Sequence, residues 1–139
     1  MKNILLSAFI LLSNLSVSAF AQEKEFVFRN DVHPEYNKNI TVDELNTLQK
    51  NEDITLIDVR LTEDFALDPI LIPGATYNDP ELITEWANLL PKDKKVVLYC
   101  VKGAWVSHKA ATYLNDKGYD VSTLNGGIRH WKSLNNKSD

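Results

Sequence analysis

Cys100 is the only cysteine of the chain and the best candidate for a nucleophile. It directly follows an apolar run typical of a buried strand, and it precedes a short loop and a predicted helix. In parallel α/β sheets, functional sites form beyond the carboxyl ends of the strands. Loop amides and the N-terminal end of the helix would stabilise a thiolate, which is the nucleophilic form of cysteine. An inert core cysteine explains the position equally well, because free cysteine is often buried.

The loop after Cys100 supplies the candidate substrate-binding residues. Lys102 is the loop's one cation and could attract an anionic substrate, although a solvated loop charge is the simpler interpretation. Trp105 either lines a pocket or packs the loop against the core. The predicted substrate contacts are Lys102, Gly103, Ala104, Trp105 and Val106.

Asp58 and Arg60 stand at the end of a second apolar run. They could orient a substrate, but a structural ion pair that supports the loop is the preferred interpretation. His33 and His130 have no partner at metal-ligand spacing and are interpreted as surface residues. His108 could assist the thiolate as a cation, although a solvated helix position is favoured. With one cysteine and no ligand cluster, the sequence predicts no metal site.

Strand-like and helix-like segments alternate around these residues. Apolar, often β-branched runs predict strands at residues 54–59, 95–99 and 119–124. Helical spacing and end signals predict helices at residues 41–50, 80–90 and 107–117, and a short last helix after Gly126. This alternation predicts an α/β fold, a three-layer sandwich whose mainly parallel sheet is flanked by helices.

Some local signals are more specific. Thr41 and Glu44 have the spacing of a capping box at a helix start. The helix predicted at 80–90 would place its apolar residues on one face, namely Leu82, Ile83, Trp86, Leu89 and Leu90. The prolines and glycine between residues 69 and 75 indicate an irregular stretch. In the polar segment 22–39, only residues 26–28 suggest a short strand or a docked arm.

The first 21 residues have the three-part pattern of a secretory signal peptide. A positively charged start precedes an apolar run at 4–15 and a small-residue stretch that ends Ala19-Phe20-Ala21. The apolar run is too short to span a bilayer of about 30 Å. We therefore expect cleavage before Gln22 and a periplasmic or secreted protein with no membrane attachment. The mature chain would consist of an N-terminal extension, 22–39, and one domain, 40–139.

Composition agrees with one folded domain and excludes some partners. The chain has 139 residues, of which 44% are hydrophobic and 24% charged, as in a globular protein. The formal net charge of −4 gives no electrostatic support for binding nucleic acid or an anionic membrane.

Five motifs in order resemble the rhodanese-like sulfurtransferase domain. They are ITVDEL at 40–45, LIDVR at 56–60, IPGA at 72–75, VLYC at 97–100, and LNGGI with a following tryptophan at 124–131. The resemblance implies that Cys100 accepts a sulfane sulfur from a small donor and carries it as a persulfide. The sulfur would then pass to cyanide or to a thiol, either of a small molecule or of a protein. No cofactor is implied, since the sulfur is both nucleophile and carrier.

The loop differs from the common family form, Cys-x-x-Gly-x-Arg-Ser. Trp105 stands where arginine is common, and one extra residue precedes Ser107. This longer loop is similar to that of a secreted subgroup with a Cys-x-x-Cys-Trp motif, in which Ala104 occupies the place of the second cysteine. The missing arginine predicts slow use of a small dianion such as thiosulfate.

Two other functions remain open from the sequence. A rhodanese-like binding or sensing module could carry a persulfide or oxidation mark on Cys100 without efficient turnover. A phosphatase or arsenate reductase of the Cys-x5-Arg type is disfavoured, because the residue six beyond Cys100 is Val106. Without that arginine, an oxyanion would lack its bidentate partner.

Overall fold

The computed structural model describes residues 25–136 and shows one sheet of five parallel strands. The strands are β1 (Asn39–Ile40), β2 (Thr55–Asp58), β3 (Ala75–Tyr77), β4 (Val96–Tyr99) and β5 (Val121–Leu124). Their order across the sheet is β1-β5-β4-β2-β3, and every neighbouring pair is parallel. The predicted α/β fold with a parallel sheet is confirmed. The predicted signal peptide, residues 1–21, lies outside the described residues.

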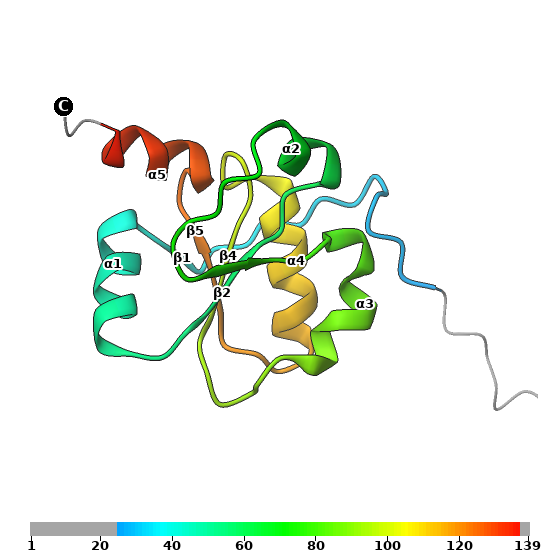
Figure 1. Ribbon diagram of the computed structural model, residues 1–139. Helices are drawn as coiled ribbons and strands as arrows, with labels where there is room; N and C mark the ends of the chain where they lie inside the picture. Colours follow the sequence, from blue (N-terminus) through cyan, green and yellow to red (C-terminus); the bar gives the residue numbers. More distant parts are fainter. Residues whose placement is uncertain (1–24, 137–139) are drawn as a thin grey trace, which may run out of the picture.

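Helices cover both faces of this sheet (Figure 1). They are α1 (Val42–Asn51), α2 (Thr62–Leu67), α3 (Ile83–Trp86), α4 (Trp105–Asp116) and α5 (Gly127–Asn135). α1 and α5 lie on one side of the sheet, and α3 and α4 lie on the other. Within residues 25–136, no helix is long and apolar enough to cross a membrane.

Two apolar clusters fill the spaces between the layers. One cluster joins Ile57 and Leu98 to α3 and α4, and the other joins Leu56 and Tyr99 to α1 and α5. Consecutive residues of a strand point to opposite faces of the sheet. Consecutive residues of β2, and likewise of β4, therefore belong to different clusters. A sheet covered on both faces needs strands that are apolar throughout, which explains their short continuous apolar runs.

The start of α1 matches its sequence signal. The Thr41 hydroxyl accepts a hydrogen bond from the Glu44 amide at 3.1 Å, and the Glu44 carboxylate accepts one from the Thr41 amide at 2.7 Å. The predicted capping box is therefore present.

The helix predicted at 80–90 is wrong as a continuous element. Two 3-10 turns, η2 (Pro80–Leu82) and η3 (Ala87–Leu89), flank the single α-helical turn α3. Ile83 and Ala87 are buried, but Leu82 and Leu89 are 47% and 82% exposed. The apolar face is thus narrower than the spacing of the leucines suggested, because Leu82 and Leu89 are out of register with the buried residues Ile83 and Ala87.

Three elements carry no clear pattern in the sequence. α2 has no buried residue, so it lacks an apolar stripe, and β1 and β3 have two and three residues.

α4 begins at Trp105 and not near Ser107, so the loop after Cys100 is shorter than predicted. No strand forms at 26–28.

Candidate active site

A cavity of about 410 Å³ lies beside Cys100, beyond the carboxyl end of β4. Its lining consists of Arg60, Leu61, Asp64, Cys100, Val101, Lys102, Ala104, Trp105, Val106 and Arg129. Four of the five predicted substrate contacts therefore surround it. The fifth, Gly103, does not line this cavity and has a structural position described below.

The Cys100 side chain faces the α4 side of the sheet and is 4% exposed. Its sulfur lies 3.2 Å from the hydroxyl of Ser107, which is in the first turn of α4 and fully buried. That hydroxyl also lies 3.2 Å from the Ala104 carbonyl oxygen. The sequence indicated Ser107 only as a helix start, whereas the structure makes it a hydrogen-bond partner of the thiol. In this arrangement the thiol donates to the hydroxyl and the hydroxyl donates to the Ala104 carbonyl; when the thiol is ionised, the hydroxyl can rotate and donate to the thiolate sulfur instead.

The N-terminal end of α5 holds the loop after Cys100. The amides of Ile128 and Arg129 donate to the carbonyl oxygens of Cys100 and Val101 at 2.9 and 3.0 Å. The structure shows no acceptor within the described chain for the amides of residues 101–104. The amides of this loop are therefore unpaired within the described chain, while the carbonyls of Cys100 and Val101 are occupied by α5.

Two glycines permit this close approach. Gly103 has a φ of +69°, and an added Cβ would lie 2.7 Å from the Leu124 carbonyl oxygen. Gly127 has a φ of +60°, and an added Cβ would lie 2.5 Å from the Cys100 carbonyl oxygen. Both positions combine a left-handed backbone with backbone contact too close for any side chain. Gly103 thus seats the loop on the β5–α5 turn and does not contact the cavity.

Asp58 and Arg60 form a buried ion pair at the end of β2. Arg60 donates to one Asp58 carboxylate oxygen at 2.6 Å and to the carbonyls of Asp68 and Ile70 at 2.9 and 3.0 Å. The two side chains are only 3% and 0% exposed. Although Arg60 lines the cavity, its guanidinium is bonded within the protein. This arrangement agrees with a supporting role and leaves little of its charge for a substrate.

Tyr99 precedes Cys100 and lies on the opposite face of the sheet, where it binds the segment before β3. Its buried hydroxyl accepts a hydrogen bond from the Ile72 amide at 3.1 Å. Burial, and secondarily the negative charge of Asp58, raise the pKa of Tyr99 well above its ordinary value. The side chain is therefore a neutral phenol at physiological pH.

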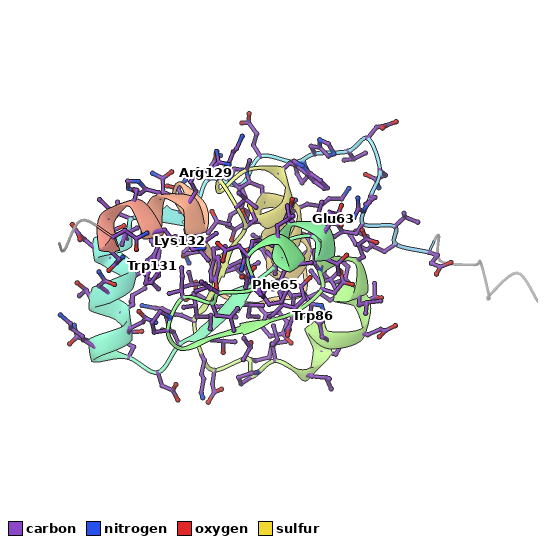
Figure 2. The ribbon with its side chains drawn as sticks, turned by 45° about the horizontal axis from the view of Figure 1, so that its top comes forward. Glu63, Phe65, Trp86, Arg129, Trp131 and Lys132 are labelled. Atoms are coloured by element: carbon purple, nitrogen blue, oxygen red, sulfur yellow. The ribbon has the colours of Figure 1, made fainter. Side chains whose placement is uncertain are left out.

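Arg129 is a cavity residue that the sequence analysis missed. It lies at the N-terminal end of α5, next to the loop after β4 (Figure 2). Within the described chain, the side chains of Arg129 and Lys102 form no ion pair, and Asp64 is the acidic residue among the cavity's lining. Arg129 lies two residues after Gly127, where the Gly126-Gly127 turn returns the chain to the edge at which Cys100 lies.

Trp105 fulfils both predicted roles at once. It is half-buried, lines the cavity, and packs against Phe28 with ring centroids 5.9 Å apart. His33 is exposed, as predicted, but its ring stacks on the Trp105 indole at 4.6 Å. His108 and His130 are part of neither this stack nor the Cys100 cavity.

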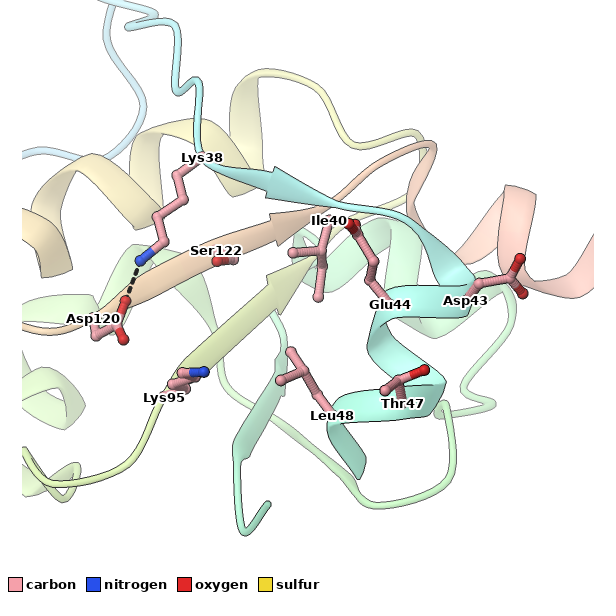
Figure 3. Close-up of a pocket in the computed structure, with 9 residues that line it drawn as sticks. All are labelled: Lys38, Ile40, Asp43, Glu44, Thr47, Leu48, Lys95, Asp120 and Ser122. Atoms are coloured by element: carbon pink, nitrogen blue, oxygen red, sulfur yellow. Dashed lines mark hydrogen bonds and ion pairs between the residues drawn. The ribbon is translucent and has the colours of Figure 1, made fainter. Parts of the chain in front are cut away.

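A second cavity, of about 490 Å³, lies between α1 and strands β1 and β5 (Figure 3). It contains no cysteine, and most of its charged groups have partners in the protein: Lys38 pairs with Asp120, Lys95 pairs with Glu52, and Glu44 belongs to the capping box, whereas Asp43 has no ion-pair partner in the described chain. Within residues 25–136, no group of three acidic, histidine or cysteine side chains could hold a metal ion. The cavity at Cys100 is therefore the candidate active site.

Known proteins resemble this chain in sequence and in fold. Residues 41–134 match the rhodanese-like domain. A sulfurtransferase from Allochromatium vinosum is 39% identical over 60% of this chain and 77% of its own length. The thiosulfate sulfurtransferase GlpE from Coxiella burnetii is 30% identical over 66% of this chain and 84% of its own. A rhodanese-like domain protein from Staphylococcus aureus has a TM-score of 0.60 at 29% identity, covering 68% of this chain and 91% of that protein. The chain therefore belongs to the rhodanese-like domain family.

Proposed function

We propose that this protein is a sulfurtransferase that carries a sulfane sulfur as a persulfide on Cys100. The observation that carries the proposal is the surroundings of the thiol. Cys100 lines a cavity beside a serine hydroxyl, a loop whose amides are unpaired among residues 25–136, and two cations without ion-pair partners in that same part of the chain. These groups favour an anionic sulfur, both as a thiolate and as a persulfide. The sulfurtransferase names of its relatives support the same class of reaction.

In the first half-reaction, the Cys100 thiolate attacks the outer sulfur of a donor such as thiosulfate. A bond forms between the Cys100 sulfur and the donor's outer sulfur, and the donor's own sulfur–sulfur bond breaks. Sulfite leaves with the electron pair of that bond. The terminal sulfur of the persulfide keeps a negative charge, which we expect unpaired amides of the loop and the Ser107 hydroxyl to stabilise.

In the second half-reaction, cyanide or an acceptor thiolate attacks the terminal sulfur of the persulfide. The bond between the two persulfide sulfurs breaks, and its electron pair returns to Cys100 as a thiolate. The products are thiocyanate or the acceptor's persulfide. No electron source from outside is needed, because the sulfur passes between nucleophiles at an unchanged oxidation state, and the mechanism requires no cofactor.

We also propose that the protein works outside the cytoplasm, in the periplasm or in secreted form. The proposal rests on the signal-peptide pattern at residues 1–21. Acceptors there would be small thiols or protein thiols.

The test is the intact mass of the mature protein after treatment with thiosulfate or polysulfide, and again after addition of cyanide. We expect a gain of one sulfur atom, its loss to cyanide, and matching thiocyanate. Cys100→Ser is the control, and it should fold normally and gain no sulfur because an alcohol is a weak nucleophile at neutral pH.

Two results would contradict the proposal. A wild-type thiol that accepts alkylating reagents but never gains sulfur from either donor would exclude persulfide chemistry. A persulfide that forms but is not released to cyanide or thiols would favour the binding or sensing module, with which the 4% exposure of Cys100 is compatible.

A further inference from the structure

The segment before the sheet forms an arm, residues 26–33, that lies outside the matched family region, 41–134. The arm has no helix or strand of its own, and it runs past the N-terminal end of α4 (Figure 1). Its contacts are nevertheless specific. The docked arm foreseen as one of two possibilities at 26–28 is the form that the structure takes.

Three anchors hold the arm on the domain. Phe28 is 2% exposed and belongs to the apolar cluster on the α4 side of the sheet. Arg29 pairs with Glu63 of α2 and with Glu81 of η2. Lys109 of α4 donates hydrogen bonds to the Asn30 side chain and, at 2.8 Å, to the Val32 carbonyl oxygen.

Lys109 shows how closely the arm covers α4. Lys109 is only 5% exposed, and burial lowers the pKa of its ammonium group. A lysine is rarely buried unless its donors find acceptors. Here both acceptors come from the arm, so α4 and the arm are built to fit each other.

The arm ends on the wall of the Cys100 cavity. The Trp105 indole lies against Phe28, and the His33 ring stacks on it at 4.6 Å with an angle of 19° between planes. Trp105 also lines a further cavity of about 460 Å³, which His33 and His108 share. The indole thus borders two cavities, and its ring contacts with Phe28 and His33 add to its packing against the core cluster.

We propose that the arm is a positioning element of the active site. By holding the Trp105 indole as a wall of the cavity, it narrows access to Cys100 and selects small, slender sulfur donors over bulky ones. His33 and Phe28 are positioning residues, since they act through Trp105. The relevance to donors rests on the proposed function, but access to the thiol can be measured without any sulfur transfer.

The test compares how fast Cys100 is alkylated by a small reagent, iodoacetamide, and by a bulky one, N-pyrenylmaleimide. In His33→Ala, the rate with the bulky reagent relative to the small one should rise about two- to tenfold, the range that loss of one aromatic stack allows. His33→Phe keeps a ring that can stack and should restore the wild-type ratio. His130→Ala removes another exposed histidine and should leave the ratio unchanged.

A second readout reports on the indole itself. In a Trp86→Phe/Trp131→Phe background, Trp105 fluorescence should be quenched more strongly by acrylamide after His33→Ala. An unchanged ratio of the two alkylation rates in folded His33→Ala would overturn the proposal. This includes the case in which both reagents react faster by the same factor, which would indicate a general loosening of the fold. Either result leaves the persulfide proposal untouched, because that proposal is tested by sulfur uptake.

Discussion

At the scale of single residues, the charges near Cys100 decide which donors it can use. Arg60 is neutralised by Asp58, whereas Lys102 and Arg129 line the cavity without ion-pair partners in the described chain. Trp105 carries no charge, so Lys102 and Arg129 are the groups of the cavity lining that can attract an anion. Arg129 comes from α5, which lies far along the sequence from the loop.

We therefore expect Arg129→Gln to weaken reactions with anionic reagents selectively. Its kcat/KM for thiosulfate should fall roughly three- to tenfold, as expected for loss of one cation that attracts the substrate. Alkylation by anionic iodoacetate should slow similarly, whereas alkylation by neutral iodoacetamide should not change. Lys117→Gln, at the end of α4 and away from the cavity, is the matched control. An equal loss with both alkylating reagents would show that Arg129 acts through loop structure and not through its charge.

The candidate site is only partly predictable from the sequence at this scale. Cys100 and its loop are recognisable because residue type, strand and loop are adjacent in the chain. The contact of Ser107 with the sulfur, the cation at Arg129 and the stacking of His33 depend on how separate elements meet. No local pattern encodes such contacts, so they emerge only from the tertiary structure.

At the scale of elements, the Asp58–Arg60 pair joins the end of β2 to the irregular segment before β3. Arg60 donates to the carbonyls of Asp68 and Ile70, and it lies over the Phe65 ring at 5.0 Å. One side chain thus supports α2 and the approach to β3. Neither element has a strong sequence signal of its own, which explains why the sequence showed an irregular stretch there.

Removing one partner of the Asp58–Arg60 pair should lower the stability of the fold strongly. Arg60→Met leaves the Asp58 carboxylate buried without its cation, so the free energy of unfolding should fall by about 3–5 kcal/mol. Urea unfolding followed by circular dichroism measures this loss. Arg29→Met is the matched control, because it removes an exposed ion-paired arginine and should cost far less. The double variant Asp58→Asn/Arg60→Met should recover part of the loss, and an additive double variant would contradict the account.

Element prediction worked where the signal was local or continuous. The capping box fixed the start of α1, and apolar runs located β2, β4 and β5 within a residue or two. The prediction of one continuous helix at residues 80–90 was wrong, because this segment forms single turns of different helix types. Short elements at the sheet edges bury too little surface to leave a periodic pattern.

At the scale of the whole molecule, the parallel sheet explains why one chain can present a thiol in this way. All strands end at the same edge, so the loop after β4, the start of α4 and the start of α5 meet there (Figure 1). Helices on both faces keep water from the strands, and Cys100 sits at the boundary between core and cavity. The alternating pattern of the sequence was sufficient to predict this architecture, since it depends on element order more than on exact ends.

Export from the cytoplasm is proposed on the signal-peptide pattern of the first 21 residues, and it can be tested directly. Expressed from its full sequence in a secretion-competent bacterium, the protein should accumulate outside the cytoplasm with Gln22 as its first residue. Cell fractionation and intact mass measure both points. Ala21→Tyr places a bulky residue at the A-x-A cleavage site and should leave an uncleaved, membrane-associated precursor. A stable cytoplasmic product that retains residues 1–21 would contradict export. Thiols tend to oxidise in the predicted compartment, where a single cysteine has no internal disulfide partner. Burial of Cys100 beside its cavity would then limit pairing with other chains while leaving the thiol open to small sulfur donors.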